Sequence, residues 1–257
     1  MKLLLDSDML LFRVVSAYDY EVCLDHGDMW VRGCDTGEAR NLYWQNVDHM
    51  CELFDAERED VFHCLTDRST FRKNLFPDYK GNRKNKPKPT GYAALKQQLL
   101  ELPNAIMHDQ VEADDLLGIF ATQLKDLQED YVVCSGDKDL RQIPGFRYWI
   151  TDEAPEYISV AQSDRQFWKQ ALMGDSTDGV KGCPGYGEKT AERAIEDFDF
   201  QNPLGCWEKV VSLFGKKGES EDYALQQARL VRILRAGEYD FNSRKVTLWN
   251  PRKTCVG

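Results

Sequence analysis

The segment KLLLDSD at residues 2–8 joins a short apolar run to two carboxylates. The run is typical of a buried strand that ends at Asp6 and is followed by a helix through Leu11 to Ala17. The stretches VFHCLTD at 61–67 and YVVCSGD at 131–137 repeat the pattern, with acids at Asp67 and Asp137. Helical segments separate these strands, so we expect a parallel sheet whose carboxyl ends carry the acids.

The whole chain predicts an α/β fold with a central, mostly parallel sheet flanked by helices. Further strands are expected at 105–107, 146–150 and 246–249, and helices at 40–54, 92–100, from 112 onward, and at 164–173, 188–197, 203–214 and 221–235. Residues 19–37 are expected to leave the core around a strand-like stretch at Met29–Val31. The pattern divides the chain into an α/β core over 1–160 and a helical region over 161–257 that includes the last strand.

The composition is ordinary for a soluble globular protein. Of the 257 residues, 42% are hydrophobic and 30% are charged, and the formal net charge is −10. No apolar run reaches the roughly 18 residues of a membrane span, and the N-terminal run is too short for a signal peptide. The eight cysteines form no CxxC pair, and Cys64 and Cys134 lie in strand-like runs. Buried free thiols and a cytoplasmic location are therefore expected.

A basic segment stands out against the negative net charge. Nine Lys or Arg residues lie between Arg68 and Lys96, against Asp78 alone. Prolines and glycines interrupt residues 68–91, here called the arch segment, and predict a long mobile loop that orders on its ligand. A basic segment facing an acidic cleft suits a metal-dependent nuclease, because the cations bind phosphates while the acids hold the ions.

Acidic residues recur in five short clusters. They are Asp6 with Asp8; Asp67; Glu112 with Asp114 and Asp115; Asp137 with Asp139; and Asp175 with Asp178. Each cluster alone has a simpler explanation, because acids cap helices and occupy turns. If the clusters converge, carboxylates that close cannot all stay ionised without cations between them. The expected ions are two Mg²⁺ or Mn²⁺, which prefer oxygen ligands and point to phosphoryl chemistry.

The stretch GCPGYGEKT at 182–190 is a glycine-rich turn that leads into a helix. Glycines let the backbone approach a phosphate, and the first N–H groups of a helix favour an anion. Lys189 and Thr190 add a charge and a hydroxyl. An ordinary helix–turn–helix connection explains the same stretch equally well.

The motifs together resemble the 5′-nuclease, or flap endonuclease, superfamily. Asp6, TDRSTFR with YKGNR (66–72 and 79–83), VEADD (111–115), SGDKDL (135–140) and MGDSTDGVKGCPGYGEKTA (173–191) stand in the family's order. The C-terminal stretch at 227–251 is most similar to the stand-alone 5′→3′ exonucleases of short-tailed bacteriophages, and the resemblance covers nearly the whole chain. It places the protein in the host cytoplasm if a phage encodes it.

The resemblance implies a role for each matching position. The first metal group would be Asp6, Asp67, Glu112, Asp114 and Asp115, and the second Asp137, Asp139, Asp175 and Asp178; Asp8 has no counterpart in distant members. Catalytic cations would be Lys80, Arg83 and Arg13. DNA would contact Arg68, Arg72, Tyr79, Lys84, Gly185, Gly187, Lys189 and Thr190. Main-chain oxygens of Leu172, Met173, Lys181, Cys183 and Tyr186 would bind K⁺ in a helix–turn–helix element of the H3TH type.

The implied activity is that of a 5′→3′ exodeoxyribonuclease using two metal ions and releasing 5′-phosphate products, with flap endonuclease and RNase H-type primer removal also expected. The partner would be double-stranded DNA with a 5′ end, a flap or an RNA–DNA hybrid, in phage DNA replication or host DNA degradation, with no membrane. A DNA-end-binding module without catalysis is one alternative. A PIN-type ribonuclease is another, although such domains are shorter and lack the 182–190 turn.

Overall fold

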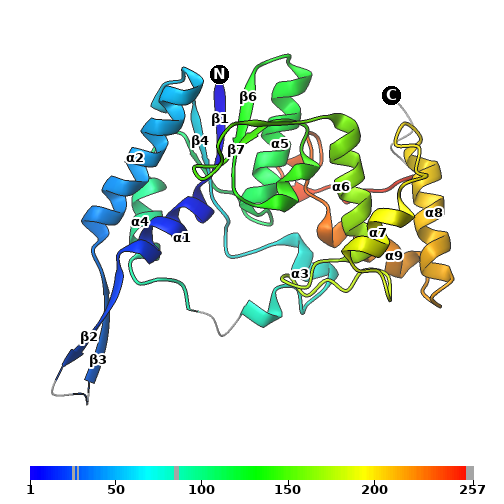
Figure 1. The fold of residues 1–257 in the computed structure, drawn as a ribbon, viewed down its shortest axis with the longest axis horizontal. Coiled ribbons are helices and arrows are strands. Elements are labelled where there is room, and N and C mark those ends of the chain that lie inside the picture. Colours follow the sequence, from blue (N-terminus) through cyan, green and yellow to red (C-terminus); the bar gives the residue numbers. More distant parts are fainter. Residues whose placement is uncertain (25–26, 28, 84–86, 253–257) are drawn as a thin grey trace.

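The computed structural model describes residues 1–24, 27, 29–83 and 87–252 (Figure 1). Its central sheet has six strands in the order β5-β4-β1-β6-β7-β8. The strands are β1 (Lys2–Asp6), β4 (Val61–Cys64), β5 (Ala105–Ile106), β6 (Tyr131–Cys134), β7 (Gly145–Tyr148) and β8 (Glu156–Ile158). All neighbours pair in parallel except β7 and β8. The predicted α/β fold with a mostly parallel sheet is confirmed, and β8 is a strand that the sequence pattern missed.

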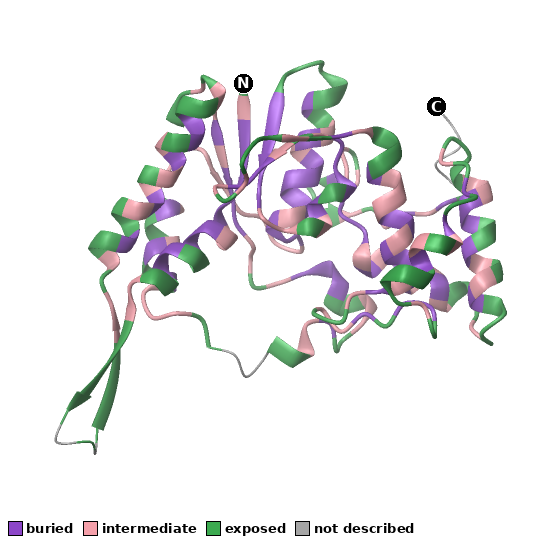
Figure 2. Cartoon of the chain, in the orientation of Figure 1, coloured by how far each residue is buried: buried purple, intermediate pink, exposed green. Residues whose placement is uncertain are grey.

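The alternating side chains of β1 build a core on each face of the sheet, because successive residues of a strand point to opposite faces. Leu3 and Leu5 pack with α1 (Ser7–Ala17), α2 (Thr36–Phe54) and α4 (Tyr92–Leu99). Leu4 packs on the other side with α5 (Ala113–Asp126). Figure 2 shows the buried strands enclosed between these helices. Helices on both faces leave the carboxyl ends of β1, β4 and β6 as the place where a site can form.

A two-stranded hairpin projects from the core between α1 and α2 (Figure 1). It consists of β2 (Asp19–Leu24) and β3 (Met29–Cys34), with Val22 opposite Val31. Its residues are coloured mostly as exposed in Figure 2, and Trp30 is the extreme case among the large hydrophobic residues, with 64% of its surface exposed. The expected excursion over 19–37 is therefore an antiparallel hairpin. Only the strand around Met29–Val31 was foreseen, because charged residues interrupt β2.

The second half of the chain forms a helical unit around its own core. Helices α6 (Val160–Met173), α7 (Glu188–Ala194), α8 (Pro203–Gly215) and α9 (Glu221–Val231) surround Trp207, Phe214 and Trp249. Helix α9 ends before the predicted residue 235, since the following Ile233 and Leu234 pack into the core beside α5. The predicted last strand is shorter and lies in a small ribbon of β9 (Tyr239–Asp240) and β10 (Lys245–Val246).

None of the helices within the described part of the chain is long and apolar enough to cross a membrane.

The first part of the arch segment is ordered, so the predicted mobile loop is wrong for residues 68–83. Helix α3 (Phe71–Leu75) and a short 3-10 helix (Gly81–Arg83) replace it. The physical reason is burial: Phe71, Arg72 and Tyr79 are enclosed by the surrounding elements, with 5%, 3% and 3% of their surface exposed. The predicted DNA contact Lys84 lies outside the described residues.

Candidate active site

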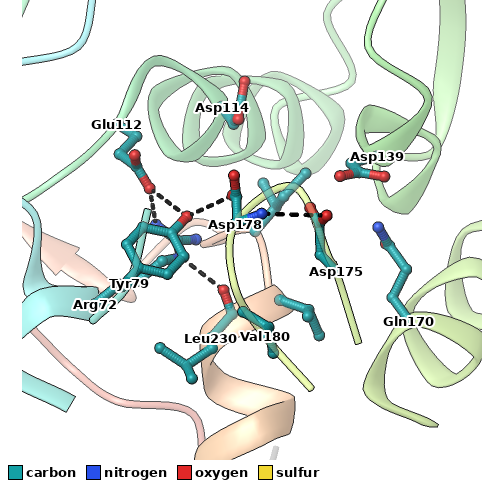
Figure 3. A pocket seen from close by; sticks show the side chains of 12 residues that line it. Arg72, Tyr79, Glu112, Asp114, Asp139, Gln170, Asp175, Asp178, Val180 and Leu230 are labelled. Atoms are coloured by element: carbon teal, nitrogen blue, oxygen red, sulfur yellow. Dashed lines mark hydrogen bonds and ion pairs between the residues drawn. The ribbon is translucent and has the colours of Figure 1, made fainter. Parts of the chain in front are cut away.

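Two neighbouring pockets share Glu112 and Asp114, which stand at the start of α5. The first is also lined by Tyr79, Asp139, Asp175 and Asp178, and Figure 3 shows several of these carboxylates facing one space. The second contains Asp6, Asp8, Lys80, Arg83, Lys88 and Tyr92. Carboxylates from β1, α5, the turn after β6 and the loop after α6 therefore line two adjoining pockets, here together called the cleft. The arch segment contributes cations to the same cleft.

The ends of two strands position Asp6 and Asp137, and each of these two acids also caps a helix. Asp6 ends β1, and one carboxylate oxygen accepts a hydrogen bond from the Met9 N–H at 3.0 Å, while the other accepts from the Ser135 hydroxyl at 2.8 Å. Asp137 follows β6 and accepts from the N–H of Asp139 at 2.9 Å. The capping explanation and the convergence of the acids are therefore both true.

The acids of the cleft perturb one another's pKa values. Burial, followed by the charges of Asp8 and Asp137, raises the pKa of Asp6 to about 6. Burial and the charges of Asp137 and Asp175 raise the pKa of Asp139 to about 7. The pKa of Asp114 is raised well above its ordinary value, again by burial and then by Asp6 and Asp137. Crowded carboxylates of this kind are stabilised by cations.

A loop after α6 brings in the last two acids. Asp175 pairs with Val180 in a short bridge and accepts a hydrogen bond from the Thr177 N–H at 2.7 Å. The hydroxyl of Tyr79 lies 2.9 Å from Asp178 and 3.0 Å from Glu112, so its single proton is shared between the two carboxylates. Burial raises the pKa of Asp178, although neighbouring cations oppose the shift. Tyr79 thus links an acid of the first metal group to an acid of the second (Figure 3).

Lys80 and Arg83 reach into this acidic cleft. The Nζ atom of Lys80 lies 2.6 Å from Glu112 Oε1 and 3.6 Å from Asp178 Oδ2, and Arg83 forms an ion pair with Asp178. Burial acts to raise the pKa of Glu112, but Arg72 and Lys80 outweigh it and lower that pKa. Two of the three predicted catalytic cations, Lys80 and Arg83, therefore lie on predicted metal ligands.

The cleft fits hard divalent cations by the chemistry of its donors. Among the described residues, no three His, Cys, Asp or Glu side chains gather tightly enough to hold a metal as they stand. Lys80 and Arg83 occupy oxygens of Glu112 and Asp178 that an ion would use. Among the other carboxylates of the two pockets, Asp6, Asp114 and Asp139 have pKa values raised by burial and by neighbouring charges, which is the setting that Mg²⁺ or Mn²⁺ relieves.

Two of the predicted DNA contacts are committed to protein partners in this structure. Arg72 donates to Asp115, Glu112 and two main-chain carbonyls, so its guanidinium faces inward. Tyr79 is equally enclosed, with its hydroxyl on Glu112 and Asp178. Both side chains border the first pocket, but only 3% of the surface of each is exposed. Asp115, expected among the metal ligands, is fully buried and pairs with Arg72.

Other predicted residues lie at the edge of the cleft or away from it. Asp67 accepts hydrogen bonds from the N–H and hydroxyl of Ser69, and Asp8 is held by Lys96, Tyr92 and the Thr66 N–H. Arg13 and Arg68 are exposed. Of the described residues that line the two pockets, none is Asp67, Arg13 or Arg68.

Several residues around the cleft were missed by sequence reasoning. Ser135 bonds Asp6, and Lys88 and Tyr92 line the second pocket. Gln170 lines the first pocket from α6. Ser135 stands two residues before Asp137 in SGDKDL, so its position beside the strand end was the available signal.

The glycine-rich turn precedes α7 as expected. Gly185 has a left-handed backbone with φ of 81°, and Gly187 is the residue before the first helical position. Both glycines, Lys189 and Thr190 are exposed. The N–H of Cys183 donates to the carbonyl of Leu172 at 2.7 Å, which places the turn against the end of α6. The roles in DNA and K⁺ binding stay predictions.

Comparisons with known proteins agree with this architecture. Residues 1–168 match the model of the 5′-3′ exonuclease N-terminal resolvase-like domain. The exodeoxyribonuclease of Enterobacteria phage T3 is 27% identical, and the exonuclease of Escherichia phage T7 is 26% identical; each match covers 97% of this chain and 93% of the relative. The fold is similar to that of the D15 flap endonuclease of bacteriophage T5, solved with DNA and metal ions, with a TM-score of 0.62, 19% identity and coverage of 89% and 88% of the two chains. Since the family model spans more than half of the sequence, the chain belongs to the 5′-3′ exonuclease family.

Proposed function

We propose that the protein is a 5′→3′ exodeoxyribonuclease that hydrolyses DNA phosphodiesters with two divalent metal ions, Mg²⁺ or Mn²⁺, and leaves 5′-phosphate products. The observation that carries the proposal is the cleft around Glu112 and Asp114, where carboxylates from four elements meet Lys80 and Arg83. The names of the phage T3 and T7 relatives support the same activity.

The carboxylates of the cleft would hold the ions in two groups. Asp6, Glu112 and Asp114 border the second pocket, and Asp139, Asp175 and Asp178 border the first. Asp137 lines neither pocket, but its charge acts on Asp6 and on Asp139. When bound, such ions supply an activated water and neutralise charge on the phosphodiester. Glu112 and Asp114 belong to both pockets, so they are the natural residues to connect the groups.

Lys80 and Arg83 would bind the non-bridging oxygens of the reacting phosphate. Both cations now rest on Glu112 and Asp178, and they would transfer to the phosphate when ions take over these carboxylates. A preorganised charge partner at the position where negative charge develops contributes strongly to the rate. The 2.6 Å contact between Lys80 and Glu112 places the ammonium group beside a carboxylate of the proposed metal site, which supports this role.

DNA would be held mainly through its phosphates, so sequence preference should be slight. The exposed Arg68, Lys88 and the 182–190 turn offer cations and main-chain N–H groups for this purpose. The bacteriophage T5 protein of similar fold was solved with DNA and metal ions, which supports the assignment. We extend the proposal to 5′ flaps, to RNA–DNA hybrids and to K⁺ at the turn.

Cleavage of 5′-labelled substrates with and without Mg²⁺ tests the proposal. Blunt, nicked and flapped duplexes and an RNA–DNA hybrid should be compared. Labelled mononucleotides or short oligonucleotides should appear with Mg²⁺ or Mn²⁺ and not with EDTA. Tight binding of every duplex without any cleavage would reject the nuclease and favour the DNA-end-binding module.

A further inference from the structure

The guanidinium of Arg72 is fully committed to protein partners. Its Nε donates to the carbonyl of Leu230 at 2.9 Å, Nη1 donates to Glu112 at 3.0 Å and Asp115 at 2.6 Å, and Nη2 donates to Asp115 at 2.7 Å and to the carbonyl of Arg232 at 2.6 Å. An arginine has five N–H groups, and these five hydrogen bonds use all of them. With 3% of its surface exposed, Arg72 has nothing to offer a phosphate.

Asp115 is saturated in the same way. One carboxylate oxygen accepts from Arg72 and from the N–H of Leu234 at 3.2 Å, and the other accepts from Arg72 and from the N–H of Glu112 at 3.0 Å. A carboxylate offers about four lone-pair positions, so no position remains for a metal ion. Asp115 is also completely buried. Glu112 and Asp114 line both pockets and Arg72 borders the first, whereas Asp115 lines neither of them.

Glu112 lines both pockets and also accepts a hydrogen bond from Arg72 of the buried pair. Its Oε2 accepts from Arg72 and from the hydroxyl of Tyr79, while its Oε1 accepts from Lys80. Arg72 therefore fixes one oxygen of the carboxylate and leaves the other toward the catalytic lysine. Ligating carboxylates are commonly oriented by such outer hydrogen bonds, and losing the partner weakens metal affinity or activity by about 10- to 100-fold.

The same side chain connects three distant parts of the chain. Arg72 lies in α3 of the arch segment, its carboxylate partners stand at the start of α5, and its carbonyl partners lie at and just beyond the end of α9. The last carbonyls of a helix lack partners within the helix, and Arg72 satisfies one of them. The helical unit that contains the 182–190 turn is thereby tied to Glu112.

We propose that Arg72 is a positioning residue that orients Glu112 for the reaction, and that Asp115 is its buried counter-ion and not a metal ligand. The proposal rests on the proposed nuclease function for its kinetic consequence. Its binding consequences stand independently: Arg72 should add nothing to the electrostatics of DNA binding, and Asp115 should add nothing to the number of bound metal ions.

Two variants of Arg72 separate positioning from phosphate binding. Arg72→Lys keeps the charge but cannot make the paired contacts, and Arg72→Met removes both. We expect kcat to be highest in wild type, lower in Arg72→Lys and lowest in Arg72→Met, with an overall loss of about 10- to 100-fold. The KM for DNA should not change. The affinity for Mn²⁺ without DNA should fall in parallel. The slope of DNA affinity against salt, measured in EDTA, should equal that of wild type.

A double variant covers the case in which Arg72→Met fails to fold. Removing one partner of a buried pair leaves the other uncompensated, whereas replacing both by apolar residues is often tolerated. Arg72→Met/Asp115→Leu should fold by near-ultraviolet circular dichroism, bind DNA like wild type and still show the reduced kcat. Arg58→Met is the matched control, because Arg58 also forms a double hydrogen bond with an aspartate, Asp48. Arg58 lies three residues before β4, whereas the cleft lies at the carboxyl ends of the strands. The control variant should change none of these quantities.

Three results would overturn the proposal. A folded Arg72 variant with wild-type kcat and Mn²⁺ affinity would remove the positioning role. A salt slope reduced by about one with unchanged kcat would make Arg72 a phosphate contact after all. Loss of one bound Mn²⁺ in Asp115→Asn would make Asp115 a ligand. Failure of the wild-type protein to cleave DNA would instead reject the nuclease function, and the Mn²⁺ and salt titrations would still decide the roles of Arg72 and Asp115.

Discussion

The Nζ atom of Lys80 lies 2.6 Å from Oε1 of Glu112, so the arch segment places its cation directly on a carboxylate of the proposed metal site. The main chain holds this arrangement, because the N–H of Lys80 donates to the carbonyl of Asp178 at 2.9 Å. Lys80 also has a left-handed backbone, with φ of 57°. A lysine fixed in this way is close to both acidic groups before any substrate arrives.

Replacing Lys80 by alanine should lower the rate of cleavage by on the order of 100-fold or more, as expected for the loss of one preorganised charge partner. The measurement is single-turnover cleavage of a 5′-labelled duplex in saturating Mg²⁺. The exposed Lys73 on α3 provides a control, and Lys73→Ala should leave the single-turnover rate within about threefold because one surface charge mainly affects binding. A change confined to KM in Lys80→Ala would make Lys80 a simple binding contact.

Asp137→Asn should abolish cleavage while DNA binding stays within about tenfold of wild type. The reason is that the substitution removes a proposed metal ligand but does not weaken the attraction of phosphates to the protein. Cleavage and DNA affinity should be measured on the same preparation. Turnover that persists in saturating Mg²⁺ would reject Asp137 as part of the two-metal site.

Local sequence patterns predicted the strands and acids that build the cleft. An apolar run that stops at an acid is a local signal, and β1 with Asp6 and β6 with Asp137 follow it directly. Because parallel strands share one edge, the pattern also predicted that these acids meet. The pKa of Asp6, raised by burial and then by Asp8 and Asp137, agrees with that expectation.

The burial of Arg72 against protein partners could not be predicted from local patterns. A basic residue in a stretch rich in glycine and proline is normally solvated, and the groups that bury Arg72 come from far along the chain. Its partner Leu230 is separated by 158 residues and Asp115 by 43. The three-residue strand β8 was missed for a different reason: it is too short to show an alternating pattern.

Asp139→Asn should stabilise the metal-free protein at pH 8 by on the order of 2 kcal/mol. Burial first, and the charges of Asp137 and Asp175 next, raise the pKa of Asp139 from its ordinary 3.8 to about 7. Between these two pH values the folded protein holds a proton that the unfolded chain has released, and at pH 8 the buried carboxylate is charged. The free energy of folding that this proton contributes is fully present below pH 3.8 and is lost as the pH rises through 7. The variant's advantage should therefore shrink at pH 4.5.

Urea unfolding of both proteins in EDTA at the two pH values measures this difference. Burial lowers the pKa of His63 to about 4, so this histidine takes up a proton on unfolding and its effect on stability has the opposite pH dependence. Both proteins contain His63, so its contribution cancels in the difference between them. Adding Mg²⁺ at pH 8 should reverse the order, because wild type gains the free energy of ion binding. Equal stability of the two proteins in EDTA at pH 8 would contradict the crowding of these acids.

Gly182→Ala should destabilise the turn that carries the predicted DNA contacts by roughly 2–4 kcal/mol, combining the cost of a left-handed residue with that of overpacking. Gly182 has φ of 66°, and a Cβ atom there would come within 2.4 Å of the Gly174 nitrogen and the Leu172 carbonyl oxygen. Gly187 is the matched control, since its φ is −91° and a Cβ there meets nothing within 4 Å. Stability to urea and duplex affinity should both fall in Gly182→Ala, whereas Gly187→Ala should cost about 1 kcal/mol or less, because alanine is a poorer N-cap than glycine. Wild-type stability in both variants would show that the close packing of the turn on α6 is not needed.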